Sequence, residues 1–208
     1  MELEDKNMDT YSNFAELRQM EPKDHYAIHL QFGTSGVAVI APHGGGIEPG
    51  TLEIARAVAG GEHTFYGFEG LKSNQNQKLH ITSTRFDEPQ CVTAVQSADK
   101  VLAIHGCSDG DESTIYTGGL DKKLKLRIEK VLSAAGFTVE HPKPVLQGRD
   151  SDNICNRGTT RCGVQLELPK NLRRRMFASL DRQGRQRPTQ LFEEFVAALR
   201  RALEPEHF

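Results

Sequence analysis

Two short and almost unbroken apolar runs most constrain the fold of this chain of 208 residues. The first is "VAVIA" at Val37–Ala41, and the second is "KVLAIH" at Lys100–His105. A strand that is covered on both faces reads as a continuous apolar run, whereas a half-exposed strand alternates. Both runs therefore predict central strands of a sheet that has helices on each face.

Strand and helix patterns alternate along the rest of the chain. The segment Gly163–Leu168 alternates apolar and polar side chains, which predicts a third main strand. Apolar side chains at helical spacing mark Glu48–Gly60, Gly119–Gly136 and Pro188–Leu203, with Thr189 as the expected N-cap of the last helix. Smaller strands are expected near Ala27–Phe32, Thr64–Phe68, Thr114–Tyr116 and Thr138–Glu140. This alternation predicts an α/β fold with three layers, in which an open mixed β-sheet has helices on both faces.

The length of the chain suits one domain. We expect a single catalytic domain over residues 1–208, with an N-terminal extension at residues 1–24 and a C-terminal helix at residues 186–208. The basic run Arg173–Arg175 is expected to begin another helix and to form a solvated face.

The charge balance argues against several classes of partner. Lys and Arg number 26 and Asp and Glu number 28, so the formal charge is −2, which gives no chain-wide basic surface for nucleic acid or a membrane. No apolar stretch approaches the ~18 residues of a membrane span. The first residues are acidic and polar, unlike a signal peptide, so we expect a protein made in the cytoplasm. The four cysteines lack C-x-x-C spacing and are expected to be reduced thiols.

Three side chains that can bind a metal stand at or just beyond the ends of the predicted strands. His43 and Glu48 lie in "PHGGGIEPG" after the first run, and His105 ends the second. Because ligands collect at the carboxyl ends of strands in such sheets, we expect these three to meet. Two imidazoles and a carboxylate, with an open position for water, are typical ligands of catalytic zinc. Glu167 is then a candidate general base, and His80 is a reserve ligand or a substrate contact.

Other chemistries have weaker support. The turn after the first run lacks the G-x-x-x-x-G-K-[ST] and G-x-G-x-x-G patterns of phosphate-binding loops, and Glu48 would repel a phosphate. The chain has no G-x-S-x-G elbow of a serine hydrolase. Cys107 is a candidate nucleophile without a partner. A lone histidine after a strand is more often structural, so it is the combination of residues that favours a metal.

Planar guanidinium groups suit the binding of a carboxylate or an oxyanion. Four arginines near the candidate site are considered for this role: Arg85, Arg149, Arg157 and Arg161.

The segments "APHGGGIEPGTLEIA", "LHITSTRFDEP", "AIHG" and "NICNRGTTRCGVQLELP" follow one another within a stretch from about Tyr26 to Leu199. Together they resemble the family of phage poly-γ-glutamate hydrolases, which also covers proteins labelled phage-related replication proteins. The resemblance covers nearly the whole chain, and the four motifs together are highly specific.

The resemblance implies a zinc peptidase whose core is similar to zinc carboxypeptidases and which cuts the γ-glutamyl amide bonds of poly-γ-glutamate, a bacterial capsule polymer. Matched by motif, His43, Glu48 and His105 would bind one zinc ion per chain, and Glu167 would be the general base. Carboxypeptidases usually space the first two ligands as H-x-x-E, whereas this chain has H-x-x-x-x-E. The carboxypeptidase arginines have no matching motif, so Arg157 is our first choice for contact with the oxyanion or with a substrate carboxylate.

The polymer is the expected partner, with further side chains as candidates for contacts with it: His80, Arg85, Arg149, Asn156 and Arg161. We expect a monomer that binds neither nucleic acid nor a membrane. The resemblance further implies a phage enzyme that is released by lysis and degrades capsules outside the host cell.

Two alternatives stay open. A zinc amidohydrolase of small N-acyl amino acids would share the site but would have a closed pocket in place of a long cleft. A DNA-replication accessory protein would need a basic stripe with stacking aromatic side chains. Only 7% of the residues are aromatic and none is Trp, so this second alternative ranks lower.

Overall fold

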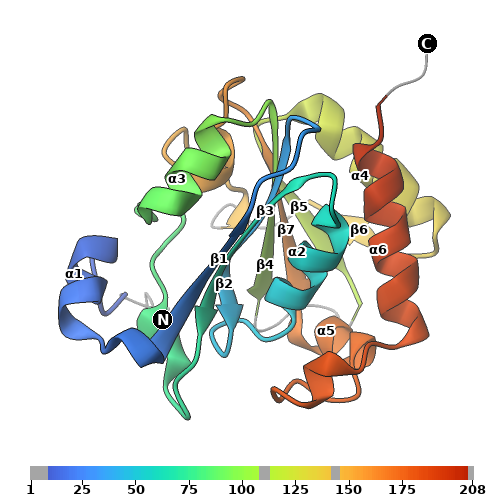
Figure 1. The fold of residues 1–208 in the computed structure, drawn as a ribbon. Coiled ribbons are helices and arrows are strands. Elements are labelled where there is room, and N and C mark those ends of the chain that lie inside the picture. Colours follow the sequence, from blue (N-terminus) through green and yellow to red (C-terminus); the bar gives the residue numbers. More distant parts are fainter. Residues whose placement is uncertain (1–8, 108–112, 142–145, 206–208) are drawn as a thin grey trace, which may run out of the picture.

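The computed structural model describes residues 9–107, 113–141 and 146–205, and a single sheet organises them (Figure 1). The strands are β1 (Tyr26–Gln31), β2 (Val37–Gly45), β3 (Thr64–Gly70), β4 (Lys100–Cys107), β5 (Ile115–Gly119), β6 (Val139–Glu140) and β7 (Val164–Pro169). They lie in the order β1-β3-β2-β4-β7-β5-β6. Neighbours among β3, β2, β4 and β7 pair in parallel, whereas β1 is antiparallel to β3 and β5 is antiparallel to β7. The sheet is therefore open and mixed, as predicted.

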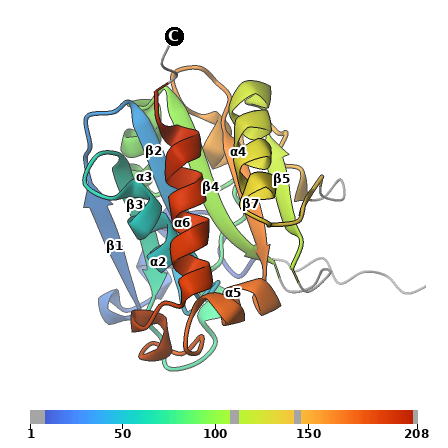
Figure 2. The ribbon, with the colours of Figure 1, turned by 90° about the vertical axis from the view of Figure 1, so that its right-hand side faces the viewer.

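Helices cover both faces of this sheet (Figures 1 and 2). On one face lie α2 (Thr51–Ala59), α4 (Lys122–Ala134) and α6 (Gln190–Leu203), and on the other lie α1 (Phe14–Met20) and α3 (Pro89–Gln96). Helix α5 (Lys170–Met176) follows β7 directly, and short 3-10 helices span Lys23–His25, Asn76–Leu79, Ile154–Asn156 and Gly184–Gln186. The expected three-layer α/β architecture is confirmed. In the described parts of the chain no helix has the length and apolar character needed to cross a bilayer.

Strand β2 shows why a continuous apolar run belongs at the centre of the sheet. Every residue of β2 is buried. Val37, Val39 and Ala41 pack into the core shared with α2 and α6, whereas Ala38 and Ile40 pack into the core beneath α1 and α3. Because successive side chains of a strand point to opposite faces, both faces of β2 must be apolar.

The described residues of the N-terminal segment pack against the rest of the fold. Phe14 and Leu17 of α1 are buried in one of the two cores. The Asn13 side chain caps α1 by accepting a hydrogen bond from the Glu16 N–H at 2.9 Å. Neither α1 nor α3 is expected from the sequence, because each is short and its apolar face is narrow.

Thr189 occupies the N-cap position of α6, as expected, but its side chain does not cap the helix. The hydroxyl donates to the Arg175 carbonyl at 2.8 Å, and the Thr189 N–H donates to the Met176 carbonyl at 3.0 Å. Thr189 therefore ties the start of α6 to the end of α5.

Candidate metal centre

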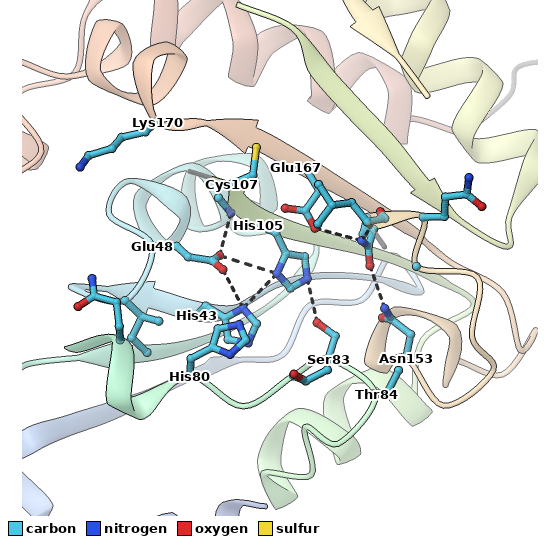
Figure 3. Close-up of a pocket in the computed structure, with 18 of the residues that line it drawn as sticks. His43, Glu48, His80, Ser83, Thr84, His105, Cys107, Asn153, Glu167 and Lys170 are labelled. Atoms are coloured by element: carbon cyan, nitrogen blue, oxygen red, sulfur yellow. Dashed lines mark hydrogen bonds and ion pairs between the residues drawn. The ribbon is translucent and has the colours of Figure 1, made fainter. Parts of the chain in front are cut away.

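The carboxyl ends of β2, β4 and β7 meet at one edge of the sheet, and the candidate site lies there (Figure 3). His43 is in β2, His105 is in β4, and Glu48 lies in the turn between β2 and α2. This turn folds back so that the Glu48 N–H donates to the His43 carbonyl at 2.9 Å. Gly45 has a φ of 65°, a left-handed conformation that favours glycine, and so the glycine run lets the chain reverse here.

The predicted ligand atoms converge. The Nδ1 atom of His43 lies 3.1 Å from Oε1 of Glu48 and 3.2 Å from Nδ1 of His105. One ligand atom from each residue can be chosen so that all lie within 4.8 Å of one another. His43 and His105 are 2% and 3% exposed, so these groups meet in a place that is largely shielded from water.

Neighbouring groups orient these atoms. The Nε2 atom of His43 lies 2.8 Å from the Ile81 carbonyl, which can only accept, so Nε2 carries the proton and Nδ1 faces Glu48. The Gly106 N–H donates to Oε2 of Glu48 at 2.8 Å, which directs Oε1 toward His43. Acceptor atoms that point at one another need either a shared proton or a cation. The donor set fits zinc, whose ligands are typically oriented by such partners.

The pKa values of the three ligands reflect burial opposed by mutual charge. Burial raises the pKa of Glu48, but the imidazole of His43 outweighs it and brings the pKa to about 2. Burial lowers the pKa of His105 to about 3, despite the charge of Glu48. For His43, burial lowers the pKa, but Glu48 outweighs it and the pKa is raised overall. Glu48 is therefore ionised and His105 neutral at neutral pH, and both are the forms that bind a metal. The raised pKa of His43 makes a proton a stronger competitor for a metal at this ring than at a free imidazole.

Glu167 lies beside His105, its register partner in the pairing of β4 with β7. Its Oε1 accepts a hydrogen bond from Nε2 of Gln165 at 3.1 Å, and Gln165 in turn accepts one from Asn153 at 2.9 Å. Burial and the charge of Glu48 raise the pKa of Glu167 well above its usual value, and Arg173 opposes this. A carboxyl with a raised pKa and one fixed oxygen is suited to exchange a proton through the other oxygen.

His80 lies against the cavity and against His43, with ring centroids 4.0 Å apart. Its Nδ1 lies 2.6 Å from Oδ1 of Asp9, whose other oxygen accepts from the Thr82 N–H at 2.7 Å. Arg85 also pairs with Asp9, at 2.6 Å, and is not among the residues that line the cavity. Asp9, in the segment expected to be an extension, therefore holds His80 in place.

The arginine-rich loop before β7 divides into different roles. Arg149 is exposed and lines the cavity. Arg157 donates to the carbonyls of Asp152, Phe86 and Thr84 at 2.7, 3.0 and 2.8 Å, and the structure does not bring it to the cavity. Its guanidinium donates to three main-chain carbonyls and does not line the cavity, so the structure gives no support for Arg157 as the contact for the oxyanion.

Two more predicted substrate contacts do not line the cavity. The buried Asn156 donates to the carbonyls of Gly148 and Asp150, both at 2.8 Å. Arg161 is exposed in a turn with a φ of 55°. Neither residue lines the cavity, so among the loop candidates only Arg149 is at hand.

The structure adds site residues that the sequence analysis missed. Arg173, expected to be solvated, is 3% exposed and lines the cavity. Lys170 and Ser83 also line it, and Ser83 Oγ lies 3.4 Å from Nε2 of His105. Gln165 could have been found, because a residue two positions before Glu167 in a strand lies on the same face.

A cavity of about 780 Å³ lies along the carboxyl edge of the sheet. Its wall includes the three ligand residues, Glu167 and the exposed cations Lys170 and Arg149. Cys107 also lines it as a free thiol, and burial raises its pKa to about 12. A thiol with that pKa stays protonated and is a poor nucleophile at neutral pH.

A family model described as poly-gamma-glutamate hydrolase matches residues 11–198. The SPbeta prophage-derived protein YoqZ of Bacillus subtilis is 38% identical over 194 residues, which cover 92% of this chain and 70% of YoqZ. YmaC of the same organism is 37% identical over 203 residues, which cover 96% of this chain and 86% of YmaC.

Two solved structures are similar over nearly their whole length. A bacteriophage poly-gamma-glutamate hydrolase has a TM-score of 0.89 at 33% identity, over 94% of this chain and 96% of that one. YNDL in an apo, zinc-free form has a TM-score of 0.89 at 35% identity, over 94% and 98% of the two chains. The chain thus belongs to the poly-gamma-glutamate hydrolase family, as its four motifs predicted.

Proposed function

We propose that this protein is a zinc-dependent hydrolase that cleaves the γ-glutamyl amide bonds of poly-γ-glutamate. The observation that carries the proposal is the convergence of His43, Glu48 and His105 beside the buried carboxyl of Glu167. Membership of the poly-gamma-glutamate hydrolase family supplies the substrate class. We propose that the whole chain acts as one catalytic unit.

Zinc would be held by His43, Glu48 and His105, and when bound it supplies a Lewis acid and makes water more acidic. Glu167 takes a proton from the water that attacks the γ-carbonyl carbon. It then delivers this proton to the departing α-amine as the amide bond breaks, so one water is consumed for each bond cut. Gln165 fixes one oxygen of Glu167 and leaves the other for the proton.

The substrate carries a free α-carboxylate on every residue, so its binding needs cations. Arg149 and Lys170 are exposed at the cavity, where they can bind these carboxylates. This role does not require either residue to contact the oxyanion. His80 is also within the wall and is proposed as a substrate contact. The near-neutral charge of the chain is compatible with a polyanionic substrate, because only the cavity need be basic.

A phage enzyme of this kind is proposed to be released by lysis and to remove the capsules of neighbouring hosts. Encapsulated cells should lose their capsule when the purified protein is added, and heat-inactivated protein should leave it intact. Capsules that persist while the isolated polymer is cut would separate the activity from this role.

The central test combines metal analysis of the purified protein with gel filtration of poly-γ-glutamate. We expect stoichiometric zinc, shortening of the polymer, loss of that shortening with a chelator and its return when zinc is added. Polymer that keeps its length in the presence of zinc-loaded protein would refute the proposal.

Two further assays address the alternatives. Release of amine from small N-acyl amino acids, with the polymer left intact, would favour a small-substrate amidohydrolase. A gel shift with DNA at physiological salt would favour the replication-accessory alternative, and we expect no shift.

A further inference from the structure

Arg173 is a buried arginine in a run whose other members are exposed. It lies in α5, the short helix that follows β7, and is 3% exposed, whereas Arg174 and Arg175 face solvent. Long charged side chains are rarely buried unless they are paired. Its position therefore needs a physical reason.

The guanidinium of Arg173 donates hydrogen bonds to three main-chain carbonyls. Nε donates to Leu168 at 3.0 Å, Nη1 donates to Pro49 at 2.6 Å, and Nη2 donates to Cys107 at 3.1 Å. These carbonyls come from β7, from the turn before α2 and from β4, segments that are remote from one another in the sequence.

Each of these carbonyls belongs to a residue within two positions of a residue of the proposed site. Leu168 follows Glu167, Pro49 follows Glu48, and Cys107 comes two residues after His105. A single planar group therefore spans the three segments that carry two of the metal ligands and the base.

The Arg173 guanidinium also packs directly against Gly106, the residue after His105. The Gly106 N–H donates to Oε2 of Glu48 at 2.8 Å, and a Cβ atom at Gly106 would lie only 2.5 Å from Cζ of Arg173. Glycine after His105 thus allows the guanidinium to pack against the same peptide that orients Glu48.

The charge of Arg173 also faces the site. Among the described residues it forms no ion pair with a carboxylate, and burial lowers its pKa, which the charges of Glu48 and Glu167 oppose. Burial of a charge without a direct counter-ion costs desolvation free energy. If Arg173 only filled space, an aliphatic side chain would do so without that cost. A fork of donors in a fixed plane is what an arginine adds.

We propose that Arg173 is a positioning residue that holds Glu48, His105 and Glu167 in register through these carbonyls. It does not touch the substrate or the metal in this role. The inference rests on the proposed function for its activity readout only, because metal affinity and metal geometry can be measured without turnover.

The test compares Arg173→Ala and Arg173→Lys with the wild type and with Arg174→Ala, a matched control on the exposed side of α5. We expect zinc affinity or turnover to fall by ~10–100-fold in Arg173→Ala, the usual cost of losing a group that orients metal ligands. The absorption spectrum of the cobalt-substituted protein should change, and kcat should fall more than KM rises. The zinc affinity and kcat of Arg173→Lys should lie between those of the wild type and Arg173→Ala. A single ammonium group cannot donate to three carbonyls in one plane.

Chemical rescue gives a readout that a purely structural role would not produce. Arg173 lines the cavity, so guanidinium ion added to Arg173→Ala at millimolar concentration can enter the vacated space. We expect partial recovery of turnover and of the cobalt spectrum, whereas urea or sodium chloride at the same concentration should restore neither.

The outcomes are separable. Wild-type zinc affinity, cobalt spectrum and kcat in a folded Arg173→Ala would overturn the inference, and if that variant does not fold, the same result in Arg173→Lys would overturn it. A wild-type protein that binds zinc but leaves the polymer intact would refute the proposed function, while the affinity and spectral comparisons would still decide the role of Arg173.

Discussion

Arg157 and Arg173 use their guanidinium groups in the same way in two regions of the molecule. Each donates to three main-chain carbonyls. Arg157 joins the loop before β7 to the loop between β3 and α3, whereas Arg173 joins β7, β4 and the turn after β2. The bonds are alike, but only those of Arg173 end close to a proposed metal ligand or to Glu167, the proposed base.

This difference shows that the role of an arginine bonded to main-chain carbonyls depends on which segments it connects. Arg157 connects segments that shape the wall of the cavity, since Thr84 lines it. Arg173 connects segments that set distances within the site. Loss of the first should therefore reduce stability, and loss of the second should reduce metal binding and turnover.

The largest loss of turnover is expected on substitution of Glu167, and the effects of the two arginine variants can be compared with it. Glu167→Gln should keep stoichiometric zinc but lose turnover by ~10²–10⁴-fold, because the amide cannot take a proton from water. Zinc analysis and initial rates on poly-γ-glutamate measure the two quantities. A wild-type rate in this variant would remove Glu167 from the role of base.

His43→Ala should have the next largest effect, because it removes a ligand atom. We expect zinc content well below stoichiometric and little residual turnover, measured by metal analysis after dialysis. His80→Ala is the control, since His80 contacts the His43 ring but hydrogen bonds to Asp9, and it should keep its zinc. Stoichiometric zinc in His43→Ala would exclude His43 as a ligand.

Arg157→Met should mainly cost stability. Loss of three charged hydrogen bonds to carbonyls is expected to lower the free energy of unfolding by roughly 2–4 kcal/mol. Urea denaturation measures this, with Arg161→Met as a control at an exposed arginine of the same loop. The folded variant should bind zinc normally. If its zinc affinity fell as far as that of Arg173→Ala, the contrast between the two arginines would disappear.

The smallest effect is expected at Glu21, which holds the N-terminal segment through Tyr11, His25 and Lys72 and does not line the cavity. Burial raises its pKa, but hydrogen bonds from His25, Lys72 and Tyr11 outweigh it and bring the pKa to about 2. The folded-state pKa lies below the unfolded value of 4.5, so this contribution is complete above that value and is lost as the pH falls toward 2.

Glu21→Gln should therefore lower stability at neutral pH by about 1–2 kcal/mol and flatten its decline in acid. Thermal unfolding at several pH values measures this, and zinc affinity should not change. An unaltered acid limb in Glu21→Gln would show that other carboxylates dominate it.

Much of the fold followed from local patterns. The apolar runs in β2 and β4 predicted strands covered on both faces, and the alternation in β7 separated Glu167 from the apolar side. Such patterns are local, because the order of apolar and polar side chains within one strand shows whether one or both of its faces are buried. The short helices α1 and α3 were missed, since their stability comes from contacts with the sheet.

By itself, the sequence determined that His43, Glu48 and His105 stand at or just beyond strand ends, where a parallel sheet brings them together. Only the tertiary structure decided which arginine serves the site. Arg173 meets Pro49 across 124 residues of chain and Cys107 across 66, and no local pattern records such contacts. An arginine donates to whatever carbonyls lie within reach, and those are fixed only when the strands have assembled.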